Sequence, residues 1–206
     1  MSKAARARCP HLAQARAVCA GSGAVEVARF EFGYWGTNTA SPTSFAGSVE
    51  ARVRFYVNGG PPWDGYPTPG AIPFFDSGWF GGFGPTGAEP LRATLVFSAP
   101  DFQPPYGSGG LLYIPASEIT WTVEFQGMRT GVDTVGLDIY SAPVVGQNYP
   151  DYWEYNGGWS LLTNAVPMDF AARMYAQQNI PEPSSLALWA LGGFGMLAFA
   201  GRLRRG

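Results

Sequence analysis

The chain has few of the residues that build most catalytic and metal centres. Among its 206 residues there is one histidine, His11, and one lysine, Lys3, and both stand within the first 23 residues. A Ser-His-Asp or Cys-His constellation and a zinc site with histidine ligands are therefore excluded from the rest of the chain. The two cysteines, Cys9 and Cys19, lie outside CxxC spacing and predict neither a metal site nor a redox compartment. We expect no metal, no cofactor and no enzymatic activity.

Charge is also scarce. Charged residues make up 14% of the chain, about half of the usual share in globular proteins. Lysine and arginine gather at the two ends, and between residues 24 and 201 six arginines stand against 15 carboxylates, which gives this stretch a net charge of −9. Nucleic-acid binding depends on basic side chains that neutralise phosphates, so we exclude DNA and RNA as partners.

Aromatic residues, glycine and proline are abundant instead. Aromatics reach 15%, hydrophobic residues reach 46%, and the chain holds 28 Gly and 18 Pro. This composition excludes a coiled coil, a helical bundle and an acidic disordered tail, while the length suits one compact domain with terminal segments.

Alternation of apolar and polar side chains predicts β-strands. It is clearest in residues 49–57, where Glu50, Arg52 and Arg54 share one face, and in residues 118–125. Further candidate strands are residues 27–35, 91–97, 134–140, 159–166 and 168–175, the last of which could instead form a helical turn. One wet face and one buried face favour antiparallel sheets, so we predict an all-β body over residues 24–176, a jelly-roll-like antiparallel β-sandwich with long Gly/Pro loops.

Residues 58–87 form a Gly/Pro-rich stretch interleaved with aromatic rings. Since proline cannot donate to a β-ladder, we expect a long loop here. Its rings suit the faces of sugars, with Asp64 and Asp76 as acceptors for hydroxyls, or they cover the end of the sandwich as a small satellite core. Both interpretations stay open.

A second aromatic and acidic cluster spans residues 148–159. Asn156, Gly157 and Gly158 predict a hairpin turn. Asp151 and Glu154 are candidates for calcium ligands or for an acid and base pair, although no calcium-loop pattern is present. From both clusters, the candidate glycan-binding residues are Trp63, Trp79, Tyr152, Trp153 and Trp159.

The carboxyl end contains an uncharged run of 18 residues, 184–201. As a helix it would be about 27 Å long, near the thickness of the hydrocarbon core of a bilayer. Arg202, Arg204 and Arg205 follow at once and predict that the C-terminus stays on the cytoplasmic side. We therefore expect a single transmembrane helix followed by its basic end over residues 184–206; the alternative is a helix buried in the core.

A linker over residues 177–183 precedes this run and ends in Pro181-Glu182-Pro183. The triplet, the short apolar run and the arginine-rich end together resemble a PEP-CTERM sorting signal, and this resemblance covers residues 180–206. It implies a substrate of exosortase, the membrane-embedded processing enzyme of Gram-negative bacteria that make extracellular polysaccharide. It also implies cleavage near the triplet and delivery to the cell surface or the exopolysaccharide matrix, with exosortase and membrane lipid as partners and exopolysaccharide as a candidate partner.

The N-terminal segment fits export less well. Residues 1–23 are basic and contain no apolar stretch of the kind that signal peptides carry. We interpret them as a leader-like segment, expected to be unstructured, or as the product of a misassigned start.

Three functions follow from the sequence. The first is an exported, non-catalytic surface or matrix protein, and the second is a carbohydrate-binding module for exopolysaccharide. The third is a glycoside hydrolase that uses a carboxylate pair.

Overall fold

The computed structural model describes residues 10–16, 25–87, 92–102, 107–108, 111–116, 119–140, 147–148, 151–162 and 169–178. Within these ranges the chain forms sixteen strands and one 3-10 turn, η1 (Ala99–Asp101). The strands are β1 (Pro10–Arg16), β2 (Val25–Asn38), β3 (Glu50–Trp63), β4 (Tyr66–Pro69), β5 (Phe75–Asp76), β6 (Arg92–Ser98), β7 (Gly107–Ser108), β8 (Leu111–Ile114), β9 (Ile119–Gln126), β10 (Asp133–Leu137), β11 (Ile139–Tyr140), β12 (Gln147–Asn148), β13 (Tyr152–Tyr155), β14 (Trp159–Leu162), β15 (Asp169–Phe170) and β16 (Ala172–Gln178).

The first sheet has the order β12-β1-β9-β3-β4, and β5 also pairs with β3. Its centre is the antiparallel pair of β3 and β9, in register from Glu50 opposite Gln126 to Val57 opposite Ile119. Both strands were predicted from their alternation.

The second sheet is built around the long strand β2. Along one edge β2 pairs first with β16 and then with β10, and along the other edge it pairs with β8 and β6. The two strands on the first edge meet at Gly33, whose N–H donates to the carbonyl of Ala171 at 2.7 Å and whose carbonyl accepts from the N–H of Asp138 at 3.1 Å. Beyond this junction the chain turns away into the small β11–β15 pair.

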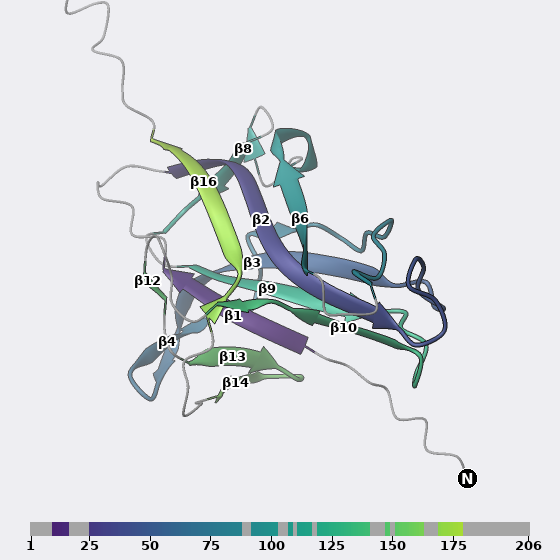
Figure 1. The fold of residues 1–206 in the computed structure, drawn as a ribbon. Helices are drawn as coiled ribbons and strands as arrows, with labels where there is room; N and C mark the ends of the chain where they lie inside the picture. The colour runs from purple at the N-terminus through teal and green to yellow at the C-terminus, as the bar shows by residue number, and fades with distance from the viewer. Residues whose placement is uncertain are drawn as a thin grey trace, which may run out of the picture.

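One hydrophobic core joins the two sheets. Phe30 of β2 packs edge-to-face against Phe55 of β3 and Trp121 of β9, with ring centroids 5.0 and 5.4 Å apart. Figure 1 shows β2, β6 and β16 crossing over the layer made by β1, β3 and β9. The prediction of an all-β fold with antiparallel sheets is confirmed.

The polar face of the first sheet is less exposed to solvent than the alternation of apolar and polar residues predicts. Thr120 of β9 is 0% exposed, although it faces away from the core. The β13–β14 hairpin lies on the side of this sheet away from β2 (Figure 1) and covers part of it. The hairpin itself was predicted, and its Gly157 adopts a positive φ of 77° in the turn.

Three local expectations need correction. Residues 58–63 continue β3 and pair with β4, so they are not loop; irregularities after Asn58 and Gly60 accommodate the glycines and prolines. Residues 10–16 of the supposedly unstructured leader form β1, which pairs with β9. Within residues 168–175, the described part is strand and not a helical turn.

The predicted transmembrane helix over residues 184–206 lies outside the described residues. Across the described residues, the structure contains no helix with the length and apolar character needed to cross a bilayer.

Candidate functional site: a charged network and aromatic rings on one sheet

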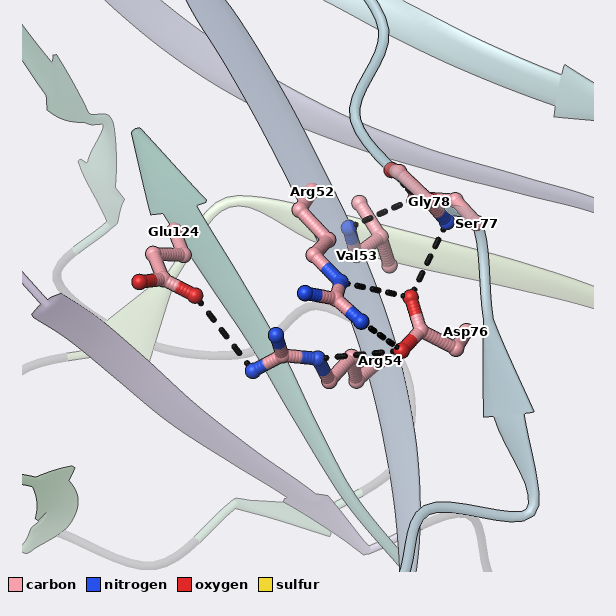
Figure 2. A network of polar contacts seen from close by, with 7 residues as sticks. All are labelled: Arg52, Val53, Arg54, Asp76, Ser77, Gly78 and Glu124. Carbon is pink, nitrogen blue, oxygen red and sulfur yellow. Dashed lines mark hydrogen bonds and ion pairs between the residues drawn. The ribbon is translucent and has the colours of Figure 1, made fainter. Parts of the chain in front are cut away.

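The best-defined polar cluster lies on the outer face of the first sheet. In β3, the side chains of Ala51, Val53 and Phe55 point into the core, so Arg52 and Arg54 point outward. The Gly/Pro-rich segment folds back along the edge of β3 and brings Asp76 beside both guanidinium groups. Figure 2 shows this carboxylate beside both arginines and bonded to each, with Glu124 of β9 on the far side of Arg54.

The carboxylate of Asp76 is fully engaged. Arg52 donates from Nε at 2.7 Å and from Nη2, Arg54 donates from Nε at 3.2 Å, and the N–H of Gly78 donates at 2.9 Å. These four bonds match the roughly four acceptor positions of a carboxylate. Asp76 therefore has no acceptor left for a sugar hydroxyl or for acid–base chemistry, contrary to its expected use as a sugar acceptor.

The same network holds the segment after β5 in place. The N–H of Val53 donates to the hydroxyl of Ser77 at 2.9 Å, and the N–H of Ser77 donates to the carbonyl of Val53 at 2.9 Å. Two residues further on, the ring of Trp79 lies 5.8 Å from the guanidinium carbon of Arg52. The network therefore positions a partly exposed tryptophan beside a cation.

The electrostatics of the network are balanced. Burial alone would raise the pKa of Asp76, but the hydrogen bonds from Arg52 and Gly78 and the attraction of both guanidinium groups outweigh it and lower that pKa. Arg54 also forms an ion pair with Glu124, with Nη1 and Oε2 3.3 Å apart. Two cations thus face two anions, which suits a clamp that fixes the shape of this surface.

A group of aromatic rings lies on the same outer face, where the β13–β14 hairpin meets β3. Trp159 packs edge-to-face against Tyr56 at 5.1 Å and against Tyr155 at 5.0 Å between ring centroids. Its Nε1–H is buried, and no described residue accepts a hydrogen bond from it. This tryptophan mainly covers the sheet, since Tyr56 beneath it is buried.

The remaining residues of the hairpin have different surroundings. Trp153 is 1% exposed, so neither face of its ring is open to a ligand. Tyr152 is partly buried and packs edge-to-face against Phe170 at 5.7 Å. Glu154 lies opposite Ser160 in the hairpin, and Asp151 immediately precedes the first strand of the hairpin. The described residues contain no group of three or more metal-ligating side chains.

Trp63 stands at the tip of the β3–β4 hairpin and is 66% exposed. No ring contact in the described part of the chain joins Trp63, Trp79 and Trp159 to one another. The predicted glycan-binding residues lie on the β3–β4 hairpin, on the segment after β5 and on the β13–β14 hairpin.

The sequence pattern did not predict Arg52 and Arg54 as partners of Asp76. Their place on one face of a strand was evident, but the pairing spans 22 to 24 residues and depends on how the Gly/Pro-rich segment folds back. No local spacing signals such a contact.

The predicted sorting residues, Pro181, Glu182, Pro183, Arg202, Arg204 and Arg205, all lie outside the described residues. These residues are assessed by comparing the chain with known proteins and protein families. No curated protein matches the chain, and no solved structure does. The family model of the PEP-CTERM protein-sorting motif matches residues 179–205, which confirms the resemblance and its confinement to the C-terminal segment. The chain thus carries at its carboxyl end a PEP-CTERM protein-sorting motif, the signal by which exosortase processes secreted, membrane-transiting precursors.

Proposed function

We propose that this protein is an exported, non-catalytic component of the cell surface or of the exopolysaccharide matrix. The observation that carries the proposal is the PEP-CTERM match over residues 179–205. In this scheme, residues 184–201 insert into the membrane as a helix, and Arg202, Arg204 and Arg205 hold the C-terminus on the cytoplasmic side. The processing enzyme then cuts near Pro181-Glu182-Pro183 and releases the β-rich body.

The triplet suits recognition by a processing enzyme. Each proline fixes φ near −65° and removes a backbone donor, so the segment around Glu182 favours an extended conformation. An enzyme can read such a segment without unfolding the body that precedes it.

The body supports a binding or structural role. Asp76 in the best-defined polar cluster is saturated by arginine and backbone donors. Such a carboxylate contributes to the shape of the surface and is poorly placed to exchange protons with a substrate. The hydrolase alternative, with Asp151 and Glu154, stays a prediction.

Carbohydrate binding by the body is the second candidate function. It is favoured by Trp79, which is partly exposed beside Arg52, and by Trp63, which is mostly exposed. Trp153 is left out of this candidate because it is buried. Flat indole faces with polar neighbours suit sugar rings, and exopolysaccharide is the ligand that this candidate function assigns to them.

Sorting is tested by expressing the full chain, with an epitope tag in the exposed Asp64-Gly65 turn, in bacterial cells with and without exosortase. With exosortase, we expect the body in the released fraction, and mass spectrometry should find its new C-terminus near the triplet. Glu182→Ala or loss of the three terminal arginines should leave the uncut precursor in the membrane fraction or misplaced. Glu154→Ala, a glutamate in the body, is the matched control and should be released normally.

Release that is unchanged by Glu182→Ala, or that is the same without exosortase, would contradict the proposal.

A further inference from the structure

A pocket of about 310 Å³ lies on the second sheet, at the junction where β10 ends and β16 begins along the edge of β2. It is separate from the charged network on the first sheet. Among the described residues its lining consists of Trp35, Arg92, Leu137, Asp138 and Ile139. Three properties of this lining point to a particular kind of ligand.

The first property is a flat aromatic wall. Trp35 of β2 lies directly opposite Gly136 of β10 in the sheet. A Cβ atom at Gly136 would come within 2.7–2.8 Å of three atoms of the indole, so the ring lies against the bare glycine backbone. One face of the indole is thus supported by the sheet, and the ring lines the pocket. Glycine is required here for close approach of the ring.

The second property is a buried acceptor. The side chain of Asp138 is only 6% exposed, and its nearest cation is Nε of Arg92 at 3.8 Å, beyond hydrogen-bond distance. No described residue donates a hydrogen bond to this carboxylate. Buried carboxylates normally accept several hydrogen bonds, so Asp138 has acceptor positions for donors on a ligand that enters the pocket.

The position of this carboxylate is also set by a glycine. A Cβ atom at Gly33 would lie 2.7 Å from Oδ2 of Asp138, so only glycine leaves room for the side chain. Backbone bonds from Asp138 to Gly33 and from Ala171 to Asp138, at 3.1 and 2.8 Å, hold the residue in place. Burial raises the pKa of Asp138, and the attraction of Arg92 offsets this only in part. Hydrogen-bond donors on a ligand would relieve the cost of burying the ionised form.

The third property is that the pocket is lined by one positive and one negative side chain. The guanidinium of Arg92 and the carboxylate of Asp138 line the same pocket, so a small ion of either sign would meet a like charge beside its partner. A neutral molecule with both hydroxyl donors and oxygen acceptors can form a hydrogen bond with each of these two groups. The volume lies at the low end of the range for ligand pockets, which suits one ring and not a longer segment.

We propose that this pocket binds a single neutral pyranose residue, whose apolar face rests on Trp35 while adjacent hydroxyl groups donate to Asp138. Arg92 donates to an oxygen of the same sugar. Leu137 and Ile139 provide the apolar remainder of the wall. The proposal concerns the body alone, so it stands independently of the sorting signal, and its site is separate from Trp63 and Trp79.

The proposal is tested on the purified full chain in a detergent without a sugar headgroup. The probes are methyl glycosides of the common neutral hexoses, with binding followed by saturation-transfer NMR and calorimetry. At least one glycoside should bind. Trp35→Ala and the isosteric Asp138→Asn should each weaken that binding by about tenfold or more. Gly136→Ala, which keeps the indole but displaces it, should do the same.

Two controls keep the result interpretable. Near-ultraviolet circular dichroism of Asp138→Asn checks that the fold is retained, because this variant changes no volume. Tyr113→Ala removes an exposed ring of β8, elsewhere on the second sheet, and should leave glycoside binding unchanged.

Three outcomes would overturn the proposal: no glycoside binds, binding survives both Trp35→Ala and Asp138→Asn, or methylammonium binds more tightly than every glycoside. If Trp79→Ala alone abolishes binding, the sugar site lies on the first sheet and this pocket is not it. None of these outcomes bears on release by exosortase.

Discussion

Asp133 offers the sharpest test of what holds the body together. Its carboxylate is 7% exposed and accepts hydrogen bonds from three backbone N–H groups, those of Ala46 and Gly47 at 2.8 Å and of Arg129 at 2.9 Å. These donors belong to the connection before β3 and to the connection between β9 and β10. One side chain therefore ties together two loops that are more than 80 residues apart.

The cost of changing Asp133 follows from counting these bonds. In Asp133→Asn the amide oxygen can take the place of Oδ2, which accepts two of the bonds, but the amide NH₂ then faces the N–H of Ala46. One charge-assisted bond is lost and one donor is left unpaired, which costs about 2 kcal/mol. Asp133→Ala loses all three bonds, and we expect about 3 kcal/mol because the donors are only partly buried.

The effect should depend on pH. Burial alone would raise the pKa of Asp133, but the three N–H bonds outweigh it and lower that pKa. Such a group stabilises the fold fully above its unfolded pKa of about 3.9 and loses this contribution as the pH falls through the lower folded value. The stability difference between the native chain and Asp133→Asn should therefore shrink below about pH 4.

The assay is urea unfolding of the full chain in mild detergent, followed by tryptophan fluorescence. With a slope of about 2 kcal/mol per molar urea, the midpoint should fall by about 1 M for Asp133→Asn and about 1.5 M for Asp133→Ala. Asp101→Asn is the matched control, since Asp101 also accepts a backbone N–H, that of Ser98 at 2.8 Å, but is exposed. A midpoint shift no larger than that of the control, or a difference that stays constant down to pH 2, would refute the reasoning.

Two further predictions concern other joints of the body. Asp76→Ala should free Arg52 and Arg54 from their common partner and shift the fluorescence emission of the neighbouring Trp79. It should also destabilise the body by about 2 kcal/mol. Urea unfolding should show a smaller loss of stability for Glu124→Ala, and equal losses of stability in the two variants would contradict the clamp. Gly127→Ala should cost at least about 3 kcal/mol, because Gly127 has a φ of 76° and a Cβ there would lie 1.9 Å from the carbonyl oxygen of Ser48. Both variants are compared by thermal unfolding, with Gly59→Ala as the control, because a Cβ at Gly59 meets nothing within 4 Å. An equal loss of stability in Gly127→Ala and Gly59→Ala would contradict the role of close backbone approach at Gly127.

Much of the local structure could be predicted from the sequence. Alternation placed Arg52 and Arg54 on one face of β3 and Val53 and Phe55 on the other, because side chains of a strand point to opposite faces in turn. The hairpin turn at Asn156–Gly158 was equally local, since glycine reaches positive φ without strain. The sorting motif needed no fold at all, because it is a short linear signal.

The contacts that define the surfaces of the body were decided by tertiary structure. Periodicity shows which side chains face outward, but not what packs on them. It therefore left open that Thr120 is buried, and that Trp153 is enclosed while Trp63 is exposed. Two contacts join residues far apart in the chain: the hydrogen bonds of Arg52 with Asp76, and the packing of the Asp138 side chain against Gly33. Such contacts arise only when the sheets assemble, since they depend on register and on backbone approach within a few tenths of an ångström, which no spacing in the sequence encodes.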